Sequence, residues 1–488
     1  MGWELIVLAE GLIGVSASVA SALSRRAGHA ATLASSIAFV SLSAAMGFRS
    51  VCGYGEFLRD TLSWWGMLLV SLVYFSSSLS SPSFIESMID SGELGDRGAR
   101  LYYVLLNSTF TMLVLLVSSN NIFMQWVLLE LSTILTIHLV MTNRRSRRAA
   151  EAAWKYYLMC ATGMAFSLYG LILLYSAGVE AGVKSPWLWS SLALARGHLA
   201  CAGRTLVLAS AFIIAGFSVK AGLFPAYMWL PDAHSEAPAP ISALLSGCLI
   251  YTPLYVLARL TPVLSASGRE PCMMLLVIGL ASILCGAGGM FLTRDVKRLM
   301  AYSSIEHMGI LAFTLSLAYA YGRPGLAFLA FNIQAMGHAL AKSCAFISSG
   351  YLTEVCGSRR ISGIDVSVDR IVGWGLVVSM LVLMGALPIP LMLSELIAAE
   401  ATGSPALLAA YLVIVMAGFA TLGWRLSHLI VSREPVRNHI LMYKPVLVRA
   451  LVIILLLTLI PVSIALFHPH LAYKLSLTPV KELVGVGC

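Results

Sequence analysis

Six ionisable side chains lie inside long apolar stretches of the sequence, where a charge is costly. Lys220 is the clearest case, because the stretch IIAGFSVKAGLFPAYMWLPDAH leaves it with no charged neighbour between Arg204 and Asp232. A charge at the centre of a bilayer costs about 2.5–3.5 kcal/mol on insertion scales, so such residues face a bundle interior and mark a pathway. The six are Glu130, Lys155, Lys220, His338, Lys342 and Glu395.

The chemistry that these residue types could perform is proton transfer. Burial favours the neutral form of lysine and of glutamate, which moves the titration of both toward neutral pH. His338 and Lys342 are four residues apart, so on a helix they share one face. We therefore predict a proton relay made of the six residues, with Lys220 as a switchable carrier.

The same residues could instead form structural ion pairs that lock helices together. His338, taken alone, could also be a core histidine with satisfied nitrogens. Six such residues spread along the chain favour the relay over ion pairs, and the neighbouring Lys342 favours a relay role for His338.

The composition is that of a membrane protein that crosses the bilayer many times. Of the 488 residues, 59% are hydrophobic and 11% are charged, whereas a soluble domain carries roughly a quarter charged residues. Apolar runs of about 20 residues recur, which is enough to cross a hydrocarbon core as helix. We expect an all-α polytopic fold, in which the first apolar run stays as a helix and is not a cleaved signal.

About 14 membrane helices are predicted. The segment 185–203 is short and of mixed polarity, and we expect it to lie along the membrane interface. The predicted helices are 3–24, 30–48, 62–82, 101–119, 121–142, 152–177, 205–224, 239–260, 271–293, 299–320, 324–350, 371–399, 405–431 and 447–467.

Two of these helices combine a backbone breaker with a charge. Lys220 is followed by Gly222 and Pro225 in the seventh helix, and Glu395 follows Pro388 and Pro390 in the twelfth. Proline frees backbone carbonyls, which a membrane helix tolerates only where protein or water satisfies them. The odd offset of five helices reverses the direction across the membrane, as in an inverted repeat.

Basic residues collect in the odd-numbered connections, which the positive-inside rule places in the cytoplasm, with both termini outside. The even-numbered connections hold fewer, such as Arg59, Lys184, Arg269 and Arg323. The odd-numbered ones hold Arg25, Arg26, Arg97, Arg144, Arg145, Arg147, Arg148, Lys297, Arg298, Arg359, Arg360, Arg433 and Arg437.

Cofactor and nucleic-acid binding are not expected from this chain. The 9 cysteines are scattered, without the paired spacing of zinc, haem or iron–sulfur ligands. The net charge of +9 does not imply a nucleic-acid partner, because basic loop residues of membrane proteins chiefly set the orientation of the chain in the bilayer.

Three motifs resemble one family of membrane proteins over residues of about 100 to 400. GFSVKAGLFPAYMWLPDAHSEAPAPISALLSG, DVKRLMAYSSIEHMGI and GHALAKSCAFISSGYL resemble the antiporter-like subunits of respiratory complex I, Mrp cation/proton antiporters and membrane-bound nickel–iron hydrogenases. HSEAPAPISALLSG and YSSIEHMGI are most similar to the hydrogenase-four component F branch.

The resemblance implies fourteen helices with two inverted five-helix repeats, and broken seventh and twelfth helices. It implies that Glu130 pairs with Lys220, that Lys155 is the sixth-helix lysine, and that Glu395 ends the relay after the eleventh-helix pair, His338 and Lys342. The implied regions are 1–100 for helices 1–3, 101–260 and 261–431 for the repeats, and 432–488 for the last helix and tail.

The sequence departs from the family pattern at three places. Tyr251 stands where many members carry an eighth-helix lysine, and Tyr227 replaces the usual histidine of FPxHxWLP. A tyrosine hydroxyl with a pKa near 10 is a poor proton carrier at neutral pH. Leu387 and Pro388 stand where paired prolines are usual, with Pro390 as an additional proline.

The predicted function is proton translocation in a redox-driven complex of the cell membrane, related to hydrogenase or NADH:quinone oxidoreductase. The expected partners are other membrane subunits and, through them, a redox-active peripheral arm, with protons or Na⁺ as the transported ion. The alternatives are a cation/proton antiporter component without a redox partner, and a scaffold subunit that does not pump.

Overall fold

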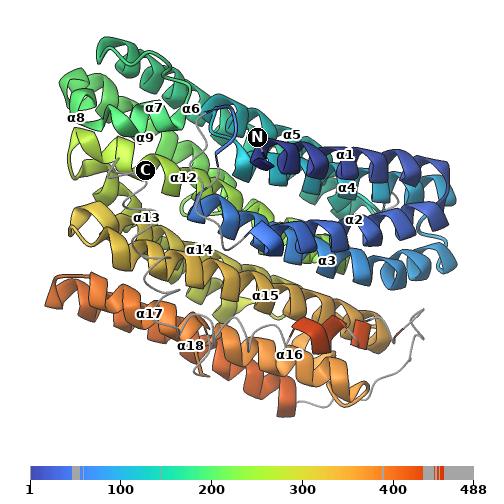
Figure 1. Cartoon of the computed structure of the whole chain (residues 1–488). Coiled ribbons are helices and arrows are strands. Elements are labelled where there is room, and N and C mark those ends of the chain that lie inside the picture. The colour runs from blue at the N-terminus through green and yellow to red at the C-terminus, as the bar shows by residue number, and fades with distance from the viewer. Residues whose placement is uncertain are drawn as a thin grey trace.

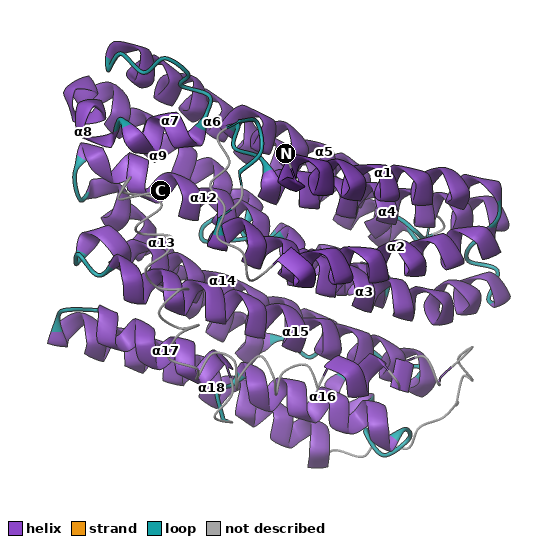
Figure 2. Cartoon of the chain, viewed as in Figure 1, coloured by secondary structure: helices purple, strands orange, loops and turns teal. Residues whose placement is uncertain are grey.

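The computed structural model describes residues 2–46, 55–58, 60–143, 146–386 and 390–431, together with 445, 448–449 and 451–455. Within these residues the chain is helices and loops, with no strand beyond isolated bridges (Figure 2). The helices run side by side, with the N-terminal helices in one part of the bundle and α16–α18 at its far edge (Figure 1). The all-helical membrane fold is confirmed.

The helix bounds follow the apolar runs closely, with ends fixed by polar caps. The side chains of Asp60, Asn121, Ser146, Asp295 and Asp369 accept hydrogen bonds from backbone N–H groups at the starts of α3, α5, α6, α14 and α16, which satisfies donors that a helix start leaves free. The first helices are α1 (Gly2–Leu23), α2 (Arg25–Met46), α3 (Thr61–Asp90), α4 (Asp96–Ser118), α5 (Ile122–Val140) and α6 (Arg147–Glu180).

The remaining helices include several short pieces. The predicted interfacial segment 185–203 is built from three of them, α7, α8 and η1. The elements are α7 (Trp189–Leu194), α8 (Arg196–Leu199), η1 (Ala200–Ala202), α9 (Gly203–Lys220), α10 (Trp229–Glu236), α11 (Ala239–Leu244), η2 (Leu245–Leu249), α12 (Tyr251–Leu264), η3 (Ser265–Ser267), α13 (Glu270–Leu292), α14 (Val296–Ala320), α15 (Pro324–Cys356), η4 (Ile361–Gly363), α16 (Arg370–Leu383), α17 (Pro390–Ala401) and α18 (Pro405–Val431).

Some expected features lie outside the described residues. These are Pro388 and Leu387 beside the second break, the basic residues Arg59, Arg144, Arg145, Arg433 and Arg437, and most of the predicted helix 447–467. Ten helices are long and apolar enough to span a membrane among the residues described, and the predicted number of 14 stays a prediction.

The predicted seventh and twelfth helices are both interrupted, and the interruptions begin in the same way. After α9, the amide of Leu223 donates to the carbonyl of Ser218, and Gly222 has a φ of 71°. After α16, the amide of Ala386 donates to the carbonyl of Leu381, and Gly385 has a φ of 61°. Each is a helix C-terminus with glycine in the left-handed conformation, so the two halves of the chain end these helices with the same motif.

Aligning the two stops shows that the charges are not equivalent. Lys220 is the last residue of α9, before its break, and the matching position in α16 is Leu383. Glu395 lies after the second break, within α17. The sequence correspondence between Lys220 and Glu395 is therefore one of helices and not of positions.

Glycines bring two pairs of helices into backbone contact. A Cβ on Gly170 of α6 would lie 2.7 Å from the backbone nitrogen of Ile213 in α9. A Cβ on Gly309 of α14 would lie 2.7 Å from the carbonyl oxygen of Gly279 in α13. Small residues permit this close packing in membranes, where no hydrophobic driving force brings helices together.

Burial separates central helices from peripheral ones. The span Ala239–Ser267, which contains α11 and α12, is 100% buried over its most apolar window, whereas Ile6–Leu23 and Pro405–Val431 are each 28% buried. The central position of α11 and α12 places them between the two halves of the chain.

The odd-numbered connections lie at one end of the bundle, where several of their basic residues form ion pairs. We name this end the basic end, and Arg25, Arg298 and Arg359 mark it. Arg25 pairs with Glu86 at the end of α3. Arg298, at the start of α14, contacts Asp232 of α10, and Arg359 contacts Glu236 of the same short helix, at 2.7 and 2.8 Å. By the positive-inside rule, this end is the predicted cytoplasmic one.

A buried ion pair lies at the opposite end of the bundle. The guanidinium of Arg259 in α12 binds the carboxylate of Asp60 and the hydroxyls of Ser63 and Tyr255, and it lies 4.9 Å above the ring of Trp189. Burial alone would raise the pKa of Asp60, but the charge of Arg259 and hydrogen bonds from Arg259 and Ser63 lower it below its ordinary value. This network joins α3, α7 and α12.

We expect Gly222→Ala and Gly385→Ala each to destabilise the protein by about 1–2 kcal/mol, because an L-residue is strained in the left-handed region. Thermal unfolding of the purified protein in detergent measures the effect. Gly288→Ala is the matched control, since no atom lies within 4 Å of the added Cβ. An equal apparent Tm for all three variants would contradict the assignment of the two stops.

We expect Asp60→Asn to cost about 3–5 kcal/mol, because it leaves the Arg259 guanidinium buried without a counter-charge. Asp96→Asn is the control, since Asp96 pairs with Arg100 while 66% exposed, and such surface pairs contribute about 1 kcal/mol or less. The lowered pKa of Asp60 makes this pair stabilising above about pH 4, and the contribution is lost as the pH falls through the folded-state pKa. Thermal unfolding at pH 7 should separate the two variants; similar apparent Tm values would refute the argument.

Candidate functional site

Lys220 ends α9 in the interior of the bundle, with no exposed surface. Its ammonium donates a hydrogen bond to the hydroxyl of Thr133 in α5 and lies 5.6 Å from the centre of the Tyr156 ring in α6. The hydroxyls of Tyr156 and Thr136 lie 2.8 Å apart. Two helices, α5 and α6, thus surround the Lys220 ammonium with hydroxyls and an aromatic face, which stabilise an ammonium without neutralising it.

Glu130 lies one helical turn before Thr133 on α5. Its Oε2 is buried and has no hydrogen-bond partner, and its charge interacts with that of Lys220. The two do not form a direct ion pair among the residues described, since Thr133 takes the contact with the ammonium. The implied pair of Glu130 and Lys220 is therefore an interaction across a gap.

The short helix α10 connects this region with the second half of the chain. Trp229, at its start, stacks on Tyr156 with ring centres 4.6 Å apart. One turn further along, His234 is fully buried and stacks on Phe346 of α15 at 4.7 Å. The charge of Lys342 interacts with His234, so α10 faces both lysines.

Lys342 lies in α15 with no exposed surface. Its ammonium donates to the carbonyl of Met300 at 2.6 Å and to the hydroxyl of Ser303, both in α14. The next hydroxyl, Ser304, lies 2.8 Å from that of Ser246 in η2. The second lysine is thus held, like the first, by neutral oxygens and not by a carboxylate.

His338 lies one turn before Lys342, as predicted, with its ring centre 5.3 Å from that of His307 in α14. His307 Nδ1 is 3.0 Å from Gln334 Nε2, and Gln334 Oε1 accepts a hydrogen bond from Ser394 of α17. Both nitrogens of His338 are buried without a hydrogen-bond partner. A polar line therefore runs from Lys342 through the histidines to the start of α17.

Two carboxyl groups lie at the end of this line. Glu395 is 8% exposed and its Oε1 has no partner. Glu306 of α14 is fully buried, and neither of its oxygens has a hydrogen-bond partner. Glu306, Glu395 and the hydroxyl of Tyr411 in α18 lie close enough to influence one another electrostatically.

Lys155 lies apart from the other predicted residues. Its side chain is 48% exposed and pairs with Glu151 at 2.6 Å and with Asp232 at 3.2 Å. Asp232 also binds Arg298, so Lys155 belongs to the basic end and not to the buried interior. The predicted helix begins at residue 152, which leaves Glu151 outside it. The observed helix α6 begins at Arg147 and therefore places Glu151 one turn before Lys155, as its partner.

Five of the six predicted residues thus fall into two buried clusters, one around Lys220 and one around Lys342. No hydrogen bond or ion pair of the described residues joins the two clusters directly. Sequence reasoning missed several members of the second cluster, although YSSIEHMGI placed an acid and a histidine inside a predicted helix. The missed residues are His234, Glu306, His307, Gln334 and Tyr411.

Tyr251 is also in the interior, with a hydroxyl that has no partner. Its ring centre is 6.2 Å from that of Tyr255 and 6.0 Å from that of Phe331. It packs against aromatic rings of α12 and α15.

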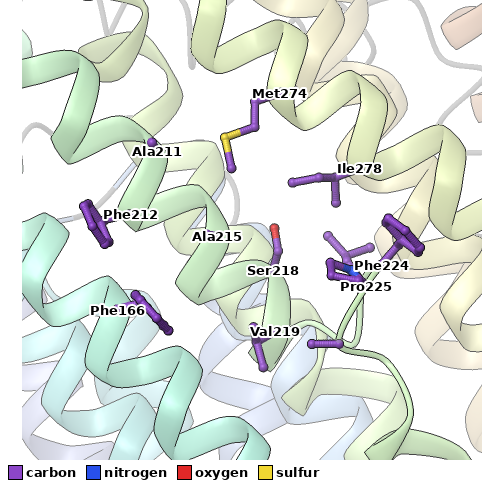
Figure 3. A pocket seen from close by; sticks show the side chains of 12 residues that line it. Phe166, Ala211, Phe212, Ala215, Ser218, Val219, Phe224, Pro225, Met274 and Ile278 are labelled. Carbon is purple, nitrogen blue, oxygen red and sulfur yellow. The ribbon is translucent and has the colours of Figure 1, made fainter.

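A cavity of about 420 Å³ lies beside the break in the predicted seventh helix. Ser218 is surrounded there by apolar side chains that include Phe166, Phe212, Met274 and Ile278 (Figure 3). Water in a protein interior needs two to four polar partners. This cavity is therefore not a water-filled connection between the clusters.

The fold and the buried clusters define a polytopic helical membrane protein with broken helices beside titratable side chains. Among the residues described, no group of three or more His, Cys, Asp and Glu side chains is arranged to hold a metal ion. Residues 119–423 match the family model described as NADH:quinone oxidoreductase/Mrp antiporter, TM. The chain belongs to this family.

Two relatives illustrate the family. The hydrogenase-4 component F homolog of Methylacidiphilum infernorum (isolate V4) is 36% identical over 366 residues, which cover 73% of this chain and 75% of that protein. The NADH-quinone oxidoreductase subunit N of Maricaulis maris (strain MCS10) is 30% identical over 249 residues, which cover 51% of this chain and 50% of that protein.

Solved structures share the fold at low sequence identity. A chain of respiratory complex I from Thermus thermophilus has a TM-score of 0.80 at 18% identity, covering 99% of this chain and 100% of that chain. A chain of the Mrp complex from Dietzia sp. DQ12-45-1b has a TM-score of 0.78 at 16% identity, covering 98% and 96%. The similarity extends over the whole length of the bundle.

We expect Thr133→Val to destabilise the protein by about 1–3 kcal/mol, because it removes a hydrogen-bond acceptor from a buried ammonium. Thr162→Val is the control, since Thr162 is exposed on α6 and bonds only its own helix at Leu158. Thermal unfolding in detergent measures both. Equal stability of the two variants would show that Thr133 does not hold Lys220.

Proposed function

We propose that this chain is the proton-translocating membrane subunit of a redox-driven complex, similar to a hydrogenase or an NADH:quinone oxidoreductase. The observation that carries the proposal is the pair of buried clusters around Lys220 and Lys342, each centred on an ammonium held by neutral oxygens. A lysine in such surroundings can lose and regain its proton more easily than one paired with a carboxylate.

The proposed path begins at the basic end. Lys155 and Asp232 would collect protons at that surface, and α10 would bring them inward, since it carries both Asp232 and the buried His234. Lys220 and Lys342 would act as carriers on the two sides of α10. His338 would then pass the proton toward Glu395 and the opposite end.

Water must complete this path. The two clusters are not joined by direct hydrogen bonds of the described residues, and the nitrogens of His234 and His338 lack partners. Buried waters typically bridge groups of this kind. The path is therefore closed while dry and conducts when water enters between the clusters.

The gap between Glu130 and Lys220 offers a switch. Bringing a carboxylate to about 4 Å from the ammonium would stabilise the charged form by about 4 kcal/mol at an effective dielectric of 20. This corresponds to a change of roughly three orders of magnitude in the protonation equilibrium. A neighbouring subunit that moved α5 relative to α9 would thus load or unload Lys220.

The proposed setting is the cell membrane, with the basic end in the cytoplasm and both termini outside. The partners would be other membrane subunits and, through them, a redox-active peripheral arm that supplies the energy. The two five-helix repeats would be 101–260 and 261–431, preceded by helices 1–3 and followed by the last helix and tail. This chain would hold no cofactor of its own.

Two other functions are distinguished by transport measurements. An antiporter component would move protons in exchange for Na⁺ without redox turnover. A non-pumping scaffold would leave transport unaffected by changes at the buried lysines. The observations that favour the scaffold are Tyr227 in place of the usual histidine and Tyr251 in place of an eighth-helix lysine.

We expect Lys220→Met and Lys342→Met each to abolish proton transport by the reconstituted complex while redox turnover continues in part. Lys184→Met is the matched control, because Lys184 is an exposed lysine in the loop after α6, and it should transport as the wild type does. Proton uptake into vesicles with a pH-sensitive dye measures transport. Full transport by the Lys220 and Lys342 variants would refute the relay, and a requirement for Na⁺ would favour the antiporter.

A further inference from the structure

The two buried carboxyl groups of the second cluster have an environment that no other acidic pair of the described residues shares. Glu306 has two unpartnered oxygens and Glu395 has one. An ionised carboxylate buried without hydrogen bonds or a counter-charge costs far more than a neutral one. At least one of the two groups must therefore be compensated by a cation or hold a proton.

Glycines of three segments make room for these carboxyls. A Cβ on Gly418 of α18 would overlap with Oε1 of Glu306, and a Cβ on Gly286 of α13 would lie 2.7 Å from the backbone nitrogen of Glu306. A Cβ on Gly385, at the end of α16, would lie 3.1 Å from Oε2 of Glu395. Residues of α13, α18 and the end of α16 thus pack closely against the two acids.

The charged groups around the pair can be counted. Lys342 of α15 is the cation whose charge interacts with Glu306. An imidazolium at His338 would leave buried N–H donors without acceptors, since both of its nitrogens lack partners, and Nε2 of His307 lacks one too. Tyr411 contributes a neutral hydroxyl. Among the described residues, Lys342 is thus the one cation identified in the cluster that contains the two carboxyls.

We propose that Glu306 and Glu395 form a single proton-binding site, in which two carboxyl groups share one exchangeable proton. With Lys342 charged, one proton on the pair makes the cluster neutral, whereas no proton leaves an uncompensated buried charge. Like charges close together cannot both ionise at little cost. The protons of such a pair belong to both residues jointly.

The site deepens the proposed function, and it rests on that function only for its role in transport. A proton released from the Lys342 ammonium or its histidine neighbours would meet a pair that already holds one proton. Binding the second would displace the first toward the end of the bundle opposite the basic end. No bond other than O–H and N–H bonds forms or breaks, and each proton lost by a donor is gained by the pair.

Infrared spectroscopy of the purified full-length protein tests the sharing of the proton. The C=O absorption of a protonated carboxyl shifts in D₂O and can be followed in Glu306→Gln, in Glu395→Gln and in the double variant. We expect each single variant to lose as much of this band as the double variant, because the remaining carboxyl then ionises as the counter-charge that keeps the cluster with Lys342 neutral. The expected ratio of double to single loss is therefore about 1.

Independent acids would give a different result. If each single variant lost half of the band that the double variant loses, a ratio of about 2, the shared site would be refuted, as it would if no variant changed the band. Glu10→Gln is the control, because Glu10 is a fully buried, unpartnered carboxyl in α1. Glu10→Gln should remove only the contribution of Glu10 to the band, and this loss should add to the loss caused by changes at the pair.

Gly418→Ala tests the same site without removing an acid. The added methyl would displace the Glu306 carboxyl, and we expect a shifted or weakened band, while an unchanged band would contradict the proposed geometry. Gly423→Ala, on the same helix, would meet only the flexible end of Met384 and should leave the band unchanged. Because these spectra report protonation and not transport, they can succeed or fail separately from the lysine variants.

Discussion

The interior of this protein depends on the cost of placing ionisable groups in an apolar bundle. The structure reduces that cost in two different ways. At the ends of the bundle, charges are paired directly, as Arg259 is with Asp60. In the interior, Lys220 and Lys342 are held by hydroxyls and a backbone carbonyl, which solvate an ammonium but leave it free to lose its proton.

Charged side chains are paired at the ends of the bundle and unpaired in its interior, and this difference defines a direction along the bundle. Lys155, Asp232 and Arg298 gather charge at the basic end, where solvent screens it. The segment after the break in the seventh helix connects the basic end with the interior. Its helix α10 places Asp232 at the basic end and buries His234 against α15. The same helix stop recurs before α17, where the line of polar side chains ends at Glu395.

The sequence predicted most of the described helices, the two breaks and five members of the two buried clusters, because long apolar runs and isolated charges are local patterns. It could not predict that Lys155 contacts Asp232, because the two residues are distant in the chain. It also missed Glu306, whose role depends on Gly286 and Gly418 from two other helices. The gap between Glu130 and Lys220 likewise follows from three-dimensional packing, which places Thr133 against the ammonium.

Proton transfer between the two clusters depends on water that links them across α10. The most direct measurement is a cryo-electron microscopy map of the assembled complex, at a resolution that shows ordered water. We expect a chain of waters, within hydrogen-bond distance of one another, from Lys220 past His234 to Lys342 and on to Glu395. Tight packing of apolar side chains between the lysines, with no water in any state of the complex, would contradict this expectation.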